Sequence, residues 1–135
     1  MYSLIIDVLV SFLLGSMVFF AGIVAPSIHR SLDKEQSGKL LRAVFPGYFM
    51  WGIILSAIIL AVCVFHSPKG SVLIGFVLVG FIYSRFWLRP RVNVARDKWH
   101  ESDSPQHKAH FYTLHRQSVI ISVLQMLMLF TIIIA

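Results

Sequence analysis

The sequence predicts an all-α integral membrane protein, a four-helix bundle whose two termini lie on the outer side of the membrane. Hydrophobic residues make up 57% of the 135-residue chain and charged residues only 13%, a balance unlike that of water-soluble domains. The apolar residues fall into four long blocks, which three short polar segments separate. Every Lys and Arg except Lys69 lies in or beside the first and third polar segments, and such basic loops stay in the cytoplasm.

The four apolar blocks predict transmembrane helices over residues 3–28, 47–65, 72–88 and 105–135, within a single domain of residues 1–135. At about 1.5 Å per residue the first helix is about 39 Å long, enough to cross a bilayer with some tilt. The last helix begins where Ser104 offers an N-cap hydroxyl and Pro105 suits the first helical position. Its length predicts that its first turns stand in the cytoplasm.

The first polar segment predicts a short interfacial helix before the second transmembrane helix. Asp33 and Gln36 have the spacing of a capping box, and apolar residues then recur on one side of the segment as far as Phe45. Pro46 disfavours a helical residue before it, so we expect the short helix to end there. Its basic side chains are expected to contact anionic headgroups of the lipid bilayer.

Small and polar residues mark the helix faces that are expected to point into the bundle. Gly15 and Gly22 of the first helix, and Gly75 and Gly80 of the third, would permit close helix contacts. On the last helix a stripe recurs at spacings of three or four residues: His107, Phe111, His115, Ser118, Ser122 and Gln125. Polar side chains at membrane depth face protein or water, so this stripe is expected to line the bundle interior.

A basic ridge is expected at the end of the third helix, provided that the helix continues past Pro90. Its members recur at spacings of four, four and three residues and end beside an acidic residue: Arg85, Arg89, Asn93, Arg96 and Asp97. One interpretation is anchoring in the inner leaflet by snorkelling side chains. The other is a site for an anionic headgroup or an acidic ligand, with Arg85, the deepest cation, as its best candidate.

Two of the six histidines, His29 and His115, lie where helices enter the membrane on the cytoplasmic side and could face each other across the bundle. Neutral imidazoles bind metal ions and haem iron, so this pair would bracket a haem or a metal, or relay a proton. The alternative is that each imidazole hydrogen-bonds to a neighbouring loop. No motif of a nucleophilic catalyst is present, and the single cysteine, Cys63, excludes an intramolecular disulfide.

Several short motifs occur together along the chain: Gly15 with Gly22 and Pro26, Phe45-Pro46-x-Tyr48, Leu88-Arg89-Pro90-Arg91-Val92-Asn93, Arg96-Asp97, and Leu114-His115-x-x-Ser118 with Gln125. On these residues nearly the entire chain resembles the transmembrane protein 205-like family, a domain of unknown function. The resemblance implies a small four-helix membrane bundle and names no reaction. Ser122 stands where that family is expected to have Asn. A wider likeness to copper-resistance and protoporphyrinogen oxidase membrane proteins would imply copper or haem, but no clear copy of their ligand sets is present.

These observations favour a non-enzymatic, multi-pass protein of the bacterial inner membrane that binds a lipid, a small ligand or a protein partner at a polar cytoplasmic mouth. The candidate ligand-binding residues are His29, Arg85, Arg89, Asn93, Arg96, Asp97, His115, Ser118 and Gln125. Two alternatives stay open: a haem- or metal-binding redox protein that uses His29 and His115, and a homo-oligomeric channel or transporter. Nucleic acid is not an expected partner, because no aromatic-interleaved basic surface accompanies the net charge of +6.

Overall fold

The computed structural model describes residues 1–135, and nearly all of them are helical. The elements in chain order are α1 (Tyr2–Phe19), η1 (Phe20–Val24), α2 (Ala25–Ser31), α3 (Lys34–His66), α4 (Pro68–Tyr83), η2 (Ser84–Leu88), α5 (Arg89–Glu101) and α6 (Pro105–Ile134). Because η1 and η2 are π-helical turns inside longer helices, the chain forms four continuous helices of 30 to 34 residues. All four are long and apolar enough to cross a membrane, as in a multi-pass membrane protein.

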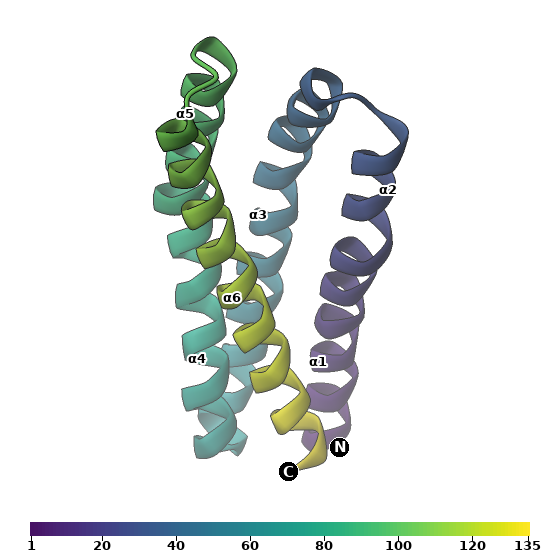
Figure 1. Ribbon diagram of the computed structural model, residues 1–135. Coiled ribbons are helices and arrows are strands. Elements are labelled where there is room, and N and C mark those ends of the chain that lie inside the picture. Colours follow the sequence, from purple (N-terminus) through teal and green to yellow (C-terminus); the bar gives the residue numbers. More distant parts are fainter.

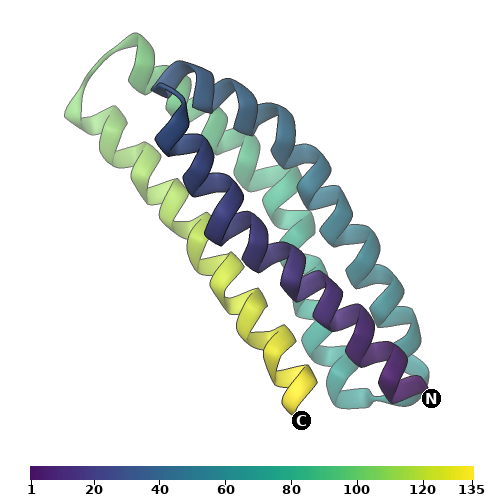
Figure 2. The ribbon, with the colours of Figure 1, turned by 90° about the vertical axis from the view of Figure 1, so that its right-hand side faces the viewer.

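The four helices run side by side along one bundle, and both termini lie at the same end (Figure 1 and Figure 2). We call this the terminus end. The basic end, opposite to it, comprises α2, residues 34–46 of α3, η2 with α5, and residues 105–118 of α6. It contains every Lys and Arg except Lys69. In Figure 1, α2 and α5 stand on opposite sides of the basic end, with α3 between them.

The prediction of a separate interfacial helix that ends at Pro46 is wrong. α3 runs without a break from Lys34 to His66 and contains Pro46. The predicted start is confirmed, because the Gln36 N–H donates a hydrogen bond to the Asp33 side chain at 2.8 Å. A proline inside a helix removes one hydrogen bond, to the carbonyl four residues earlier, whereas a break in the helix would free several backbone groups.

Two further prolines follow π-helical turns in the middle of long helices. η1 comes before Pro26, and η2 comes before Pro90. A proline ring clashes with the carbonyl four residues earlier, and a π-helical turn widens the helix at that point. The third long helix therefore continues past Pro90 as far as Glu101, which confirms the condition set for the basic ridge.

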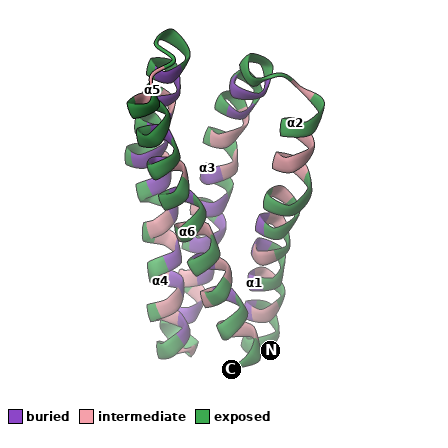
Figure 3. Ribbon diagram, in the orientation of Figure 1, coloured by how far each residue is buried: buried purple, intermediate pink, exposed green.

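Buried apolar side chains form two clusters with different contributors. The larger cluster has 12 buried residues, which come from α1, α3, α4 and α6. The smaller has six, all from η2, α5 and α6. α2 contains no buried residue, and neither does η1 (Figure 3). The basic end is therefore held by packed helices on one side and only loosely covered by the first helix on the other.

Close helix contacts occur at only some of the glycines. A Cβ atom added to Gly80 would lie 2.7 Å from Nε2 of Gln125, as predicted for a packed glycine. One added to Gly52 would lie 2.5 Å from Cε1 of Phe81. The prediction is wrong at three positions that have no neighbouring atom within 4 Å: Gly15, Gly22 and Gly75. Spacing along a helix defines a face, but it does not say which face another helix covers.

Candidate functional site

Two adjoining cavities lie between the helices, one at the basic end and the other next to it, toward the middle of the bundle. The basic chamber has a volume of about 230 Å³ and 14 lining residues, drawn from all four long helices. The apolar chamber has a volume of about 450 Å³ and 15 lining residues. His29, Arg89 and His115 line both chambers, together with Ala25 and Phe45, so the two cavities meet at these side chains.

The basic chamber collects cationic and titratable side chains without a carboxylate. No Asp or Glu lines it, whereas six basic residues do: His29, Lys34, Arg89, Arg96, His100 and His115. They come from α2, α3, α5 and α6, so the tertiary fold concentrates the charge. A concave surface lined by charges of one sign raises the local concentration of oppositely charged ligands. The chamber is therefore suited to an anion.

Two buried arginines dominate the electrostatics of this chamber. Arg89 is 6% exposed and Arg96 is 8% exposed. Nε of Arg89 and Nη1 of Arg96 are buried without a hydrogen-bond partner, and so is Nδ1 of His115. The Arg89 guanidinium lies 4.0 Å from the centre of the Phe45 ring, and that of Arg96 lies 5.2 Å from the Phe111 ring. These rings offset only part of the cost of removing two cations from water.

Gly38 gives Arg96 the space to cross from α5 to α3. A Cβ atom on Gly38 would lie 3.3 Å from Cδ of Arg96 and 3.6 Å from its Nη1. The neighbouring Ser37 ties the start of α3 to α2 and to the connecting residue Leu32, because its hydroxyl donates to the carbonyls of Ile28 and Leu32 at 3.3 and 3.2 Å. The wall that faces Arg96 is thus a fixed first turn of a helix.

Lys34 and Trp99 form another part of the wall. Nζ of Lys34 lies 4.3 Å from the centre of the Trp99 ring, a cation–π contact between α3 and α5. The Trp99 ring also stacks on Phe111, with 5.5 Å between the ring centres, and its Nε1–H donates to Asp103 at 3.3 Å. The indole is therefore held in place and lies beside any group that enters the chamber.

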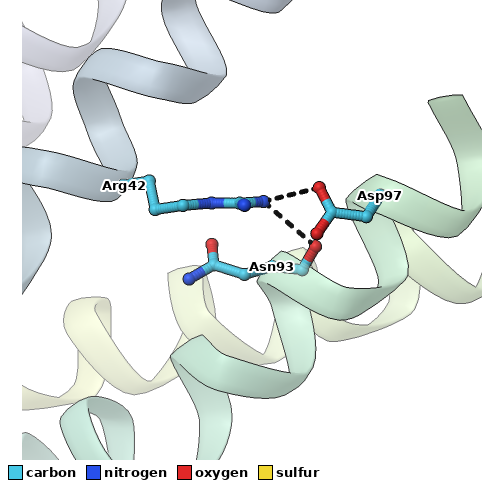
Figure 4. A network of polar contacts seen from close by, with 3 residues as sticks. All are labelled: Arg42, Asn93 and Asp97. Atoms are coloured by element: carbon cyan, nitrogen blue, oxygen red, sulfur yellow. Dashed lines mark hydrogen bonds and ion pairs between the residues drawn. The ribbon is translucent and has the colours of Figure 1, made fainter.

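An ion pair joins α3 to α5 next to the basic chamber (Figure 4). Nη2 of Arg42 donates to Oδ1 of Asp97 at 2.7 Å and to the backbone carbonyl of Asn93 at 3.3 Å. The two charged side chains are 43% and 52% exposed, and exposed pairs of this kind contribute about 0–1 kcal/mol. Asp97 and Arg42 line a side cavity of about 180 Å³, which adjoins the basic chamber at Gly38, Arg96 and His100. The Asp97 carboxylate is therefore engaged by Arg42 and lies outside the basic chamber.

The apolar chamber lies between the first helix, α3 and α6. Nine of its 15 lining residues are hydrophobic. Phe20 of η1 stacks on Tyr48 of α3 with 4.3 Å between the ring centres, so aromatic rings cover part of its wall. Ser118 and Ser122 place two hydroxyls on the α6 side. This chamber can hold an apolar group with few polar contacts.

Five predicted site residues come together at the two chambers. His29, Arg89, Arg96 and His115 line the basic chamber, and Ser118 lines the apolar chamber. The polar stripe on α6 faces the bundle interior as predicted, since Phe111, Ser118 and Gln125 are buried. The fold therefore unites residues that are separated by more than 80 positions in the sequence.

The other predicted site residues lie apart from both chambers. Asp97 lines the side cavity, whereas Arg85, Asn93 and Gln125 line none of these three cavities. Nε2 of Gln125 donates to the Val77 carbonyl at 2.8 Å, which links α6 to α4. Arg85 and Asn93 each carry a buried polar atom without a partner, Nε and Oδ1 respectively.

Sequence reasoning did not assign Lys34, Gly38 or Trp99 to the site. Lys34 and Gly38 belong to the segment that was expected to lie at the lipid surface, and Trp99 to a loop. Their placement depends on α3 and α5 continuing as helices and meeting each other, and no local pattern carries that information.

The predicted metal and haem ligands lie together, but no larger ligand set surrounds them. No group of three or more His, Cys, Asp and Glu side chains is arranged to hold a metal ion. The two imidazoles of His29 and His115 fall short of the three or four protein ligands usual for zinc. A haem held by this pair stays a prediction, which the visible absorption spectrum of the purified protein tests.

Four membrane-length helices and a cationic chamber at one end define the class, a small all-helical protein with the architecture of a multi-pass membrane protein. The chain belongs to the family described as "Domain of unknown function (DUF4149)", whose model matches residues 8–101. This match includes His29, Arg89 and Arg96 and ends before α6. The narrower likeness to the transmembrane protein 205-like family is not confirmed by it.

One relative is an uncharacterized protein of Aquifex aeolicus (strain VF5). It is 46% identical over 50 residues, which are 37% of this chain and 38% of that protein. The chain thus spans less than half of the length of this relative. No solved structure matches the chain.

Proposed function

We propose that the protein is a non-enzymatic membrane protein that binds a small anionic group in the basic chamber. One observation carries the proposal: Arg89 and Arg96 are more than nine-tenths buried, keep donor atoms without partners, and share a chamber with no carboxylate. Guanidinium groups bind carboxylate and phosphate oxygens through two parallel hydrogen bonds. Lys34 of α3 adds a third cation to the lining.

The energetics support a ligand over a purely structural role for these arginines. Removing each cation from water costs several kcal/mol, while a cation–π contact contributes about 0.5–2 kcal/mol. A hydrogen bond to a charged group contributes about 1.5–3 kcal/mol. An anion that accepts several of them therefore offsets the part of the desolvation cost that the cation–π contacts leave. Replacing the arginines by apolar residues would be the simpler solution if packing were their only role.

We propose that the basic end faces the cytoplasm of a bacterial inner membrane and that both termini lie outside. The confinement of Lys and Arg to the basic end, with Lys69 as the exception, supports this orientation. A reporter enzyme that is active only outside the cytoplasm is expected to be active when fused after Ala135. Activity of a cytoplasm-specific reporter at the same position would reverse the orientation.

The fluorescence of Trp99 tests anion binding, because this indole lines the basic chamber. A variant with Trp51→Phe and Trp87→Phe leaves Trp99 as the single tryptophan, and both replaced residues are exposed. Titration of this protein in phosphatidylcholine nanodiscs with inorganic phosphate is expected to give a saturable change in emission. Arg96→Gln should weaken the apparent affinity at least tenfold, since a buried charged hydrogen-bond partner is worth about 2–5 kcal/mol.

Arg91→Gln is the matched control, because Arg91 lies on the same helix but is exposed and lines neither chamber. Its phosphate affinity should stay within twofold of the parent protein. A titration without saturation, or equal binding by the Arg96→Gln variant, would contradict the proposed function. Circular dichroism of each variant separates a loss of binding from a loss of fold.

The two alternatives have less support. The haem interpretation rests on His29 and His115 lining the same chambers, and it predicts a Soret band in protein from haem-replete cells. The channel or transporter interpretation requires several copies of the chain, and it predicts ion flux into proteoliposomes. Both stay predictions, and no contact in the structure favours either over anion binding.

A further inference from the structure

The apolar chamber adjoins the basic chamber. His29, Arg89 and His115 line both cavities, so a ligand held by Arg89 has its other end beside the apolar chamber. The lining then changes from basic residues to Phe20, Val119 and Met126. A ligand that fills both chambers therefore has one anionic end and one apolar end.

The volumes assign a different part of the ligand to each chamber. Sites for drug-sized molecules measure about 300–1,000 Å³. The basic chamber, at about 230 Å³, lies below that range and suits a head group only. The apolar chamber, at about 450 Å³, lies in its lower half, which suits one apolar chain.

One wall of the apolar chamber lies at the outer surface of the bundle, which would face the lipid bilayer. Ala21 of η1 and both Val119 and Val123 of α6 line this chamber and are exposed on the outside of the bundle. The wall between them is loosely held, because η1 and α2 contain no buried residue. A chain can therefore enter sideways from a bilayer.

The charge of the basic chamber favours a phosphate head over a carboxylate. Lys34, Arg89 and Arg96 supply three cations, and no Asp or Glu lines the chamber. A phosphate monoester carries about −1.5 to −2 charges at pH 7 and three strong acceptor oxygens. A carboxylate carries a single charge and two oxygens. The phosphate therefore balances more of the positive charge that lines the chamber and accepts more hydrogen bonds.

We infer that the ligand is a single-chain phosphate monoester lipid, such as an alkyl or isoprenyl phosphate, with its head in the basic chamber and its chain in the apolar chamber. The inference rests on the proposed function and adds to it the chemical class of the ligand. Free phosphate shares the head-group chemistry, so the test must separate the contribution of the chain.

The test compares three probes on the single-tryptophan protein in phosphatidylcholine nanodiscs: inorganic phosphate, dodecyl phosphate and dodecanoate. Ser122→Phe places a bulky side chain in the apolar chamber, which Ser122 lines. This variant is expected to bind dodecyl phosphate at least tenfold more weakly than the parent and inorganic phosphate within twofold of it. Dodecanoate should bind the parent protein at least tenfold more weakly than dodecyl phosphate.

A comparison between variants removes the general partitioning of an alkyl chain into the bilayer, since that is the same for all of them. Ile120→Phe is the matched control, because Ile120 is exposed on the same helix and lines neither chamber. It should bind dodecyl phosphate like the parent. If Ser122→Phe does not fold, Ala21→Phe fills the chamber from the first helix, leaves Trp99 as the single tryptophan and repeats the test.

The outcomes separate the two proposals. Equal binding of dodecyl phosphate by the parent and Ser122→Phe, with phosphate binding retained, would overturn the lipid inference and leave the anion site. Equal affinity of the parent for dodecanoate and dodecyl phosphate would overturn the phosphate assignment. Binding of neither phosphate nor dodecyl phosphate would overturn the proposed function and the inference together.

Discussion

The terminus end and the basic end belong to the same four helices, yet different forces act in them. From the terminus end to the middle of the bundle, 12 buried apolar residues from four helices form one cluster, in which Phe81 packs directly on Gly52. At the basic end, α5 and α6 form their own small cluster, and the space toward α2 and α3 contains two chambers and two buried arginines. The packed end therefore provides stability, while the basic end retains uncompensated charge that a ligand can use.

The largest expected effect is a cavity in the cluster of 12 buried residues. Phe81 is 1% exposed, and Phe81→Ala should lower the free energy of unfolding by about 3 kcal/mol, near the bottom of the range for such truncations in soluble proteins. We expect the lower value because lipid chains are as apolar as a protein core, so only packing is lost. Phe76→Ala, at an exposed position of the same helix, is the control and should change little. Unfolding by sodium dodecyl sulfate, followed by circular dichroism, measures both.

A smaller effect is expected from one methyl group at a packed glycine. Gly52→Ala should destabilise the protein by about 2 kcal/mol, because its Cβ would lie 2.5 Å from the Phe81 ring. Gly22→Ala has open space around it and should be neutral, or stabilising by up to about 1 kcal/mol through helix propensity. Equal effects of the two substitutions would remove the contrast in packing between α3 at Gly52 and η1 at Gly22.

At the basic end we expect a substitution of a buried residue to stabilise the protein instead of destabilising it. Arg96→Met, measured in phosphate-free buffer, should raise the free energy of unfolding by about 1–2 kcal/mol, because an unpaired buried cation is replaced by an apolar side chain. In saturating phosphate the parent protein should gain stability and the variant should not. Arg91→Met is the exposed control. Destabilisation by Arg96→Met under both conditions would indicate a structural role for the arginine.

The smallest effect is expected at the exposed ion pair beside the chamber. Asp97→Asn should cost about 0–1 kcal/mol, and the loss should diminish as salt is added, because both partners are exposed. A double-mutant cycle with Arg42→Gln isolates the pair energy. A coupling above about 2 kcal/mol would indicate that this pair, and not the cluster of α5 and α6, holds the basic end together.

Much of the architecture could be predicted from the sequence, because hydropathy and capping act locally. The four apolar blocks located the four long helices, and the starts of α3 and α6 follow from Asp33 and Ser104, whose side chains accept hydrogen bonds from the first turn. The prediction failed at Pro46, where local preference opposes the helix. α3 continues through Pro46 because the backbone hydrogen bonds of the unbroken helix stabilise it more than the N–H that proline lacks destabilises it.

The candidate site could be predicted only in part. The spacing of Arg89 and Arg96, and the position of His29 and His115 at the ends of apolar blocks, selected four residues that line the basic chamber. The same reasoning selected Gln125, whose side chain instead bonds the Val77 carbonyl within the packed region. Helical spacing identifies a face, while the depth and partner of each residue depend on the neighbouring helices.

The sequence by itself determined the helices, their membrane length and the gathering of basic residues at one end, since each follows from residue type and local spacing. Only the tertiary structure decided that Arg96 crosses to Gly38, that Arg89 lies over Phe45, and that a basic and an apolar chamber adjoin. These features arise between segments that lie far apart in the chain. The physical reason is that burial, and with it the loss of solvent around a charge, depends on what packs against a residue and not on what precedes it.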